Sequence, residues 1–172
     1  MKLRQILPFI VAASSLFVFS GCDKDNDGET TELNIRLTDN PFNATAVNVD
    51  IERVQVKLRE EGDSWITLNT HAGIYNLLDY QNGIDTLLAQ GIVPVGPLRE
   101  IRFVLGADNS IVIDGNVYPL TIPSGSESGL KIKLNKTLTA GTDAVLIDFD
   151  AALSIFQTGT AEFKLKPVLK IK

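Results

Sequence analysis

Hydrophobic and polar residues alternate along most of this chain after about residue 32. Alternation with a period of two predicts β-strands that bury one face. Between eight and ten short strands of this kind, with one short helix, predict an all-β fold. The type expected is an antiparallel β-sandwich of Greek-key form, immunoglobulin-like or transthyretin-like. The clearest alternating segments are residues 33–37, 47–58, 101–105, 130–134, 145–155 and 163–171.

Four local signals refine the predicted strands. The alternation changes phase near Glu52 and Arg53, which predicts a β-bulge there. The pair Asp114-Gly115 lies between two apolar runs and predicts a tight hairpin. Pro119 lies in the second of these runs and cannot donate to a strand ladder, so it predicts an edge strand. Residues 84–90, which Gly91 follows, are the best candidate for the short helix.

The N-terminal segment has the order of a secretory signal. Lys2 and Arg4 precede an apolar run at residues 6–19, and Ser20-Gly21-Cys22 follows it. The run is shorter than the roughly 20 residues that a transmembrane helix needs. Small residues before a cysteine resemble the lipobox of bacterial lipoproteins. The resemblance implies that Cys22 is diacylated, becomes the mature N-terminus and holds the protein on a membrane.

The sequence therefore divides into three parts: a signal peptide at 1–21, an acidic tether at 22–31 and a single β-sandwich domain at 32–172. The tether has no apolar residue after Cys22 and is expected to be flexible. Residues 23–28 match the first half of an EF-hand loop, but Asn34 stands where the bidentate glutamate belongs. Acidic residues after the cysteine resemble a surface-export signal, which leaves the cell surface and the periplasmic face of the outer membrane as alternatives.

Charge and composition exclude several classes of function. Loss of Lys2 and Arg4 with the signal leaves 14 basic residues against 21 acidic ones, a formal charge of −7. That balance argues against a nucleic-acid partner. Cys22 is the only cysteine, so no disulfide is expected, and His71 is the only histidine, so a zinc site is not expected. We predict no cofactor.

Several motifs resemble one family. They are LTDNP at 37–41, WITL at 65–68, GIYNLLDYQNG at 73–83, REIRFVLG at 99–106, IPSGSESGLKI at 122–132, IDFDAALSI at 147–155 and LKPVL at 165–169. Together they are similar to an uncharacterised domain family of bacterial lipoproteins, a domain of unknown function, over about residues 32–171. The resemblance implies a secreted all-β domain and carries no site residues.

Asp148 and Asp150 are the sharpest candidate for chemistry. Residues i and i+2 share a face of a strand, so both carboxylates should project together, opposite Phe149. Such a pair can hydrolyse glycosides or bind calcium. It can also cap turns or pair with lysines, for which residues 131, 133, 164 and 166 are candidates, and this structural interpretation is preferred. His71 has no motif partner for catalysis, and Glu127 stands where a nucleophile elbow needs serine.

Aromatic residues offer the remaining candidates. Tyr75 and Tyr80 lie in the least regular segment, where ligand loops tend to occur. Trp65 opens a strand and is expected in the core, as a lone tryptophan usually is. We expect a non-enzymatic, lipid-anchored binding or adhesion module with a glycan or envelope protein as ligand. The alternatives are a strand-exchanging subunit of a surface assembly and a glycan hydrolase that uses Asp148 and Asp150.

Overall fold

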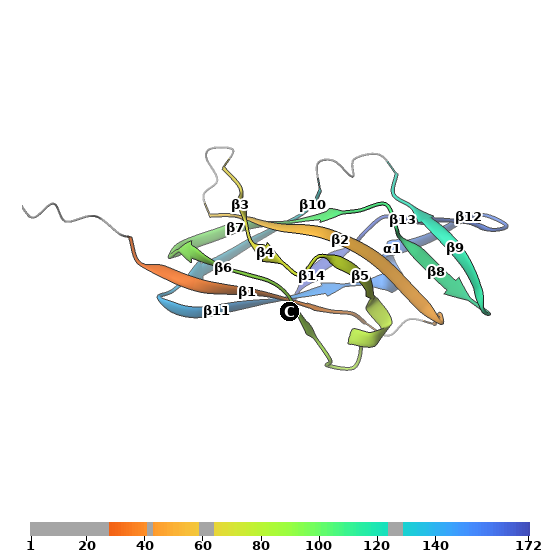
Figure 1. The fold of residues 1–172 in the computed structure, drawn as a ribbon, viewed down its shortest axis with the longest axis horizontal. Helices are drawn as coiled ribbons and strands as arrows, with labels where there is room; N and C mark the ends of the chain where they lie inside the picture. The colour runs from red at the N-terminus through yellow and green to blue at the C-terminus, as the bar shows by residue number, and fades with distance from the viewer. Residues whose placement is uncertain (1–27, 41–42, 59–63, 124–128) are drawn as a thin grey trace, which may run out of the picture.

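The computed structural model describes residues 28–40, 43–58, 64–123 and 129–172, and within them the chain forms two β-sheets. Figure 1 shows the sheets as two layers, with β1 and β11 beneath β2 and β7 in that view. The five-stranded sheet has the order β14 (Leu169–Ile171), β11 (Gly141–Phe149), β1 (Thr30–Thr38), β6 (Thr86–Pro94) and β4 (Asn69–Thr70).

The nine-stranded sheet is built around the long strand β2. Its order is β10 (Leu130–Leu138), β7 (Gly96–Leu105), β2 (Ala46–Lys57), β8 (Ser110–Ile113), β9 (Asn116–Thr121), β13 (Glu162–Leu165) and β12 (Ile155–Gly159). Two short strands, β3 (Ile66–Thr67) and β5 (Gly73–Asn76), also pair with β2. The helical elements are a 3₁₀ turn, η1 (Leu77–Tyr80), and one α-helical turn, α1 (Ala151–Ser154).

The core lies between the two sheets and is made of the inward-facing positions of their strands. Leu33, Ile35 and Leu37 of β1 alternate with less buried polar residues, as the period-two pattern requires. Phe103 of β7 and Phe149 of β11 are the largest fully buried side chains. Each buried side chain of this kind contributes about 1.5–3 kcal/mol through removal of apolar surface from water. The predicted all-β sandwich is confirmed.

Two local predictions are also confirmed. The pairing of β2 with β7 shifts register between Ile51 and Arg53, where the change of phase predicts the bulge. Asp114 and Gly115 connect β8 to β9, and both have positive φ, at 49° and 77°. Those angles belong to a type I′ turn, which Asp-Gly favours.

The helix predicted at 84–90 is wrong, because β6 occupies most of that segment. The ladder between β1 and β6 shifts register after Ile35, so that Leu88 is an extra residue on β6. This bulge buries Leu88 and Ala89 consecutively and hides the alternation in the sequence. Pairing with β1 then outweighs the local preference for a helix.

Three further expectations need correction. The sheets are mixed, because β1 pairs with β11 and β9 with β13 in parallel. Pro119 does not mark an edge: β9 lies between β8 and β13, and the pairing with β13 begins one residue later, at Leu120. The series predicted at 145–155 is two strands separated by α1. No short turn joins the parallel neighbours, so no local signal announces them.

Candidate functional site

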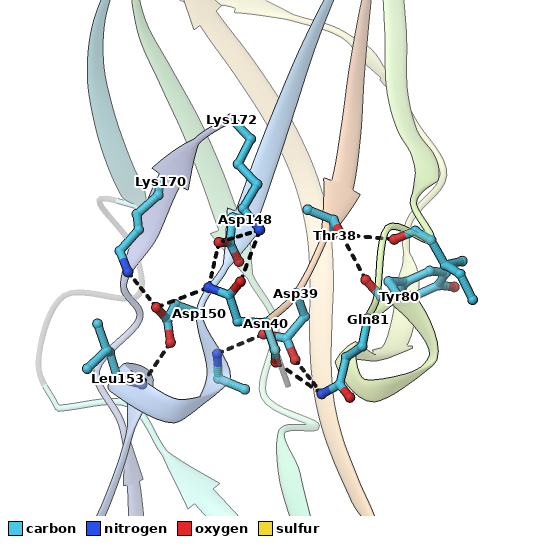
Figure 2. Close-up of polar contacts among 12 residues, drawn as sticks. Thr38, Asp39, Asn40, Tyr80, Gln81, Asp148, Asp150, Leu153, Lys170 and Lys172 are labelled. Atoms are coloured by element: carbon cyan, nitrogen blue, oxygen red, sulfur yellow. Dashed lines mark hydrogen bonds and ion pairs between the residues drawn. The ribbon is translucent and has the colours of Figure 1, made fainter. Parts of the chain in front are cut away.

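The parallel pairing of β1 and β11 brings three aspartates together at one end of the five-stranded sheet. Thr38 is opposite Asp148 in the ladder, so the residues that follow each strand meet at the same edge. Asp39 follows β1, and Asp150 follows β11 (Figure 2). The three aspartates are 2%, 0% and 4% exposed for Asp39, Asp148 and Asp150. We call them the carboxylate cluster.

Asn40 bridges the two aspartates that the sequence singles out. Its Nδ2 atom donates to Oδ2 of Asp148 at 2.7 Å and to Oδ2 of Asp150 at 3.4 Å. The prediction that Asp148 and Asp150 project together is therefore correct, although the strand ends between them at Phe149. Both side chains are buried, and they lie next to Asn40 and close to the C-terminal strand β14.

The lysines that neutralise these carboxylates come from β14 and the residue after it. Lys170 Nζ lies 2.5 Å from Asp150 Oδ2, and Lys172 Nζ lies 3.1 Å from Asp148 Oδ2. Both lysine side chains are about half exposed, at 48% and 45%. The expectation of partners at positions 131, 133, 164 or 166 is wrong. The lysines of β14 reach the cluster because β14 lies beside β11, a pairing that no turn signal reveals.

Asp150 also begins α1. Its Oδ1 atom accepts a hydrogen bond from the Leu153 amide at 3.0 Å, which is the geometry of an N-cap. The hydroxyl of Ser154 donates to the Asp150 carbonyl at 2.6 Å and accepts from the Val168 amide at 2.8 Å. One aspartate therefore connects the end of β11, the helical turn and the segment that leads into β14.

The surroundings move the pKa values of two cluster members in opposite directions. Burial raises the pKa of Asp39. This effect is larger than the lowering effect of the hydrogen bonds that Asp39 accepts from the Ala151 amide at 2.9 Å and from Gln81 Nε2 at 3.1 Å. Burial alone would also raise the pKa of Asp150. Hydrogen bonds from Lys170, the Leu153 amide and Asn40 outweigh that effect and hold the pKa below its ordinary value. Asp150 therefore remains ionised in the folded protein.

The geometry supports the structural interpretation of the carboxylate cluster. A glycosidase pair needs one proton-donating carboxyl and one ionised carboxylate that both reach the substrate. Here the carboxyl with the raised pKa is that of Asp39, which is only 2% exposed. It therefore does not meet the requirement that the proton donor reach the substrate. Among the described residues, no group of three or more histidine, cysteine, aspartate or glutamate side chains could hold a metal ion.

Tyr75 and Tyr80 lie next to each other at β5 and η1, with ring centroids 6.1 Å apart. Both rings are half-buried, and the Tyr75 hydroxyl donates to the carbonyl of His71. His71 is exposed in the loop before β5, as expected for a loop residue, and its amide donates to the Leu88 carbonyl at 2.9 Å. These contacts stabilise the irregular segment, and they leave only part of each tyrosine ring for a ligand.

Trp65 is only half-buried, so its expected place in the core is wrong. It precedes β3 at the outer surface of the nine-stranded sheet. The guanidinium carbon of Arg102 lies 3.8 Å from the centroid of its ring, and Lys131 Nζ lies 5.8 Å from the same centroid. We call Trp65, Arg102 and Lys131 the cation–aromatic face. A cation within about 6 Å of a tryptophan ring is attracted by its π electrons.

Sequence reasoning missed Asp39, Asn40, Lys170 and Lys172 in the cluster and Arg102 on the cation–aromatic face. For Asp39 and Asn40 a signal was present, because both lie within the LTDNP motif. The others depend on which strands are neighbours. The position of Cys22 lies outside the described residues.

The fold and these two sites define a class: an all-β sandwich domain with mixed sheets and a buried ionic cluster at one sheet end. The sequence profile of a family described as Domain of unknown function (DUF4382) matches residues 30–167, and the chain belongs to that family. Searches of curated proteins and of solved structures find no match. No helix in the described part of the chain is long and apolar enough to cross a membrane.

Proposed function

We propose that the protein is a lipid-anchored binding module of the cell envelope, and that it contacts its ligand through the cation–aromatic face. One observation carries this proposal: Arg102 and Lys131 are directly opposite each other in the ladder of β7 and β10, beneath a half-buried tryptophan. Like charges opposite each other destabilise a sheet. The attraction of both cations to the Trp65 ring offsets part of this repulsion. The arrangement keeps two cations and an aromatic ring together, which suits recognition of a ligand.

The alternatives have less support. Oδ2 of Asp148 and both oxygens of Asp150 contact groups within the chain, whereas Oδ1 of Asp148 is buried without a hydrogen-bond partner among the described residues. Both side chains are almost completely buried, at 0% and 4% exposed, which disfavours a hydrolase built on Asp148 and Asp150. Strand exchange would need an edge that accepts another strand. The edge strand β10 carries lysines at 131, 133 and 136, and lysines on an edge oppose pairing with another chain, so strand exchange is disfavoured at this edge; the other edge strand of the same sheet, β12, carries none.

Trp65 tests the ligand surface directly, because it is the only tryptophan of the chain and its fluorescence reports on this face alone. We expect an envelope ligand, screened among isolated polysaccharides and envelope proteins, to change the emission of Trp65. Trp65→Ala should weaken binding of that ligand by about 30-fold or more in calorimetry, as loss of a central aromatic contact does.

Tyr80→Ala is the matched control, since it removes a half-buried aromatic side chain from the irregular segment. It should leave the affinity nearly unchanged. If Tyr80→Ala abolished binding while Trp65→Ala did not, the ligand would contact the segment around η1 and the proposed surface would be wrong.

The anchor is tested at Cys22. The basic start, the apolar run and the sequence Ser20-Gly21-Cys22 motivate the prediction that the mature protein begins there with a diacylated thiol. Mass spectrometry of the membrane-extracted protein should show the added lipid mass on an N-terminal Cys22 peptide. Cys22→Ala should leave uncleaved precursor or release protein from the membrane. An unmodified thiol, or a different mature N-terminus, would contradict the anchor.

A further inference from the structure

We infer that the cation–aromatic face recognises an acidic polysaccharide, a chain of sugars that carries carboxylate or sulfate groups. This inference rests on the proposed function and specifies the chemistry of the ligand. In β10, β7 and β2 the residues Ile132, Ile101 and Val56 are buried, so their neighbours along each strand point away from the core.

The outward residues form two rows across the sheet. Lys131, Arg102 and Gln55 are aligned by register in one row, and Lys133, Glu100 and Lys57 in the next. These rows hold four cations and one carboxylate, in a chain whose formal net charge is −5. Within the described residues, no salt bridge neutralises Lys131, Arg102, Lys133 or Lys57. The face is therefore locally basic and complementary to an anionic ligand.

Arg102 contacts Trp65 and has no hydrogen-bond acceptor among the residues that the structure describes. The guanidinium carbon lies 3.8 Å from the centroid of the indole ring, and the buried Nε–H of Arg102 has no hydrogen-bond partner in the described structure. Buried donors of this kind are normally paired. An arginine that lies over an aromatic ring, with its terminal N–H groups uncommitted to a described acceptor, is suited to bind a carboxylate or sulfate through two parallel hydrogen bonds.

The spacing of the rows favours a polymer over a single small anion. Lys131 and Lys133 are two residues apart on one strand, which separates the rows by about 6.6 Å. A hollow of about 340 Å³ lies beside the second row and is lined by Arg99, Glu100, Lys133 and Leu134. A volume of this size is at the lower end of the range for small-molecule sites. The two rows, the hollow and the indole together offer repeated charge contacts and an apolar surface for a sugar ring.

The test uses the full chain in non-ionic detergent and two matched pairs of probes: polygalacturonate against its methyl ester, and dextran sulfate against dextran. Binding is followed by Trp65 fluorescence and calorimetry. We expect an acidic polymer to bind, its neutral counterpart to bind at least tenfold more weakly, and the affinity to fall steeply as salt rises. Arg102→Gln should lower the affinity by about tenfold or more, consistent with loss of a charge-assisted pair.

Lys164→Gln is the matched control, because it removes an exposed lysine from β13, away from both rows. It should leave the affinity unchanged, and circular dichroism should show that both variants are folded.

The inference would be overturned if acidic and neutral polymers bound equally, or if Arg102→Gln had no effect. It would also be overturned if inorganic phosphate bound as tightly as the polymer and displaced it, because the site would then recognise a single small anion. A ligand that is a neutral glycan or an envelope protein, and still depends on Trp65, would overturn this inference and leave the proposed function intact. If Trp65→Ala affected no ligand, the proposed function would fail too.

Discussion

Replacing Phe149 with alanine is expected to lower the free energy of unfolding by about 3–5 kcal/mol. Phe149 lies at the end of β11, is fully buried and belongs to the core between the two sheets. Its removal leaves a cavity that the surrounding strands can fill only in part, because β11 is held by β1 on one side and β14 on the other. Urea denaturation followed by circular dichroism measures the loss.

Phe156→Ala is the matched control, since Phe156 is 48% exposed on the edge strand β12. It should cost about 1 kcal/mol or less, because a side chain that remains largely in water loses little on truncation. Equal losses at Phe149 and Phe156 would contradict the assignment of the core to the space between the sheets.

The second large effect is expected at Asp150. Asp150→Ala removes the N-cap of α1 and the oxygen that accepts from Lys170 and Asn40. Loss of a cap costs about 0.5–2 kcal/mol, and loss of a hydrogen bond to a charged group about 1.5–3 kcal/mol. Because Lys170 is half exposed and can return to water, we expect the sum at the lower end, at about 2–3 kcal/mol.

Asp150→Asn separates the two contributions, since asparagine is as good an N-cap as aspartate but carries no charge. It should recover the contribution of the cap, about 0.5–2 kcal/mol, and not that of the ion pair. An asparagine variant as unstable as the alanine variant would show that the ion pair, and not the cap, dominates at this position.

The same variants predict a pH dependence. The pKa of Asp150 is lower in the folded protein than its ordinary value of 3.8, so its ionised form stabilises the fold above that pH. This contribution is lost as the pH falls through the folded-state pKa. The difference in unfolding free energy between the wild type and Asp150→Asn should therefore shrink from neutral to acidic pH. Asp39 acts in the opposite sense: its raised pKa favours the fold at acidic pH and loses that contribution as the pH rises.

The sequence predicts features that depend on neighbours along the chain. The alternation at 33–37, the bulge at Glu52-Arg53 and the Asp114-Gly115 turn are each set by a few consecutive residues, and each is confirmed. The strand β6 was mistaken for a helix because a bulge at Leu88 breaks its alternation. Residues 87–89 are three consecutive apolar residues, so this bulge leaves no visible change of phase in the sequence.

The candidate sites show the same division. The pattern of Asp148 and Asp150 predicts that the two carboxylates lie together, because i and i+2 share a face of a strand. It does not predict Lys170 and Lys172 as partners, since these depend on β14 lying beside β11. Trp65 is expected in the core only because a lone tryptophan is usually buried, and this expectation is wrong. Its ring extends over β7 and β10, and their place beside β2 is known only from the sheet order.

The central claim, that ligand binds at the cation–aromatic face, is tested most directly by NMR on the ¹⁵N-labelled full chain in detergent. Polygalacturonate is the ligand added. Binding at the proposed site predicts that the largest shifts occur at the indole Nε1–H of Trp65 and the Nε–H of Arg102, with smaller ones at the amides of Lys131 and Lys133. The amides of Ala151 and Leu153, which the carboxylate cluster holds, should not move. Shifts centred on those two amides, or on Tyr75 and Tyr80, with Trp65 unchanged, would contradict the account.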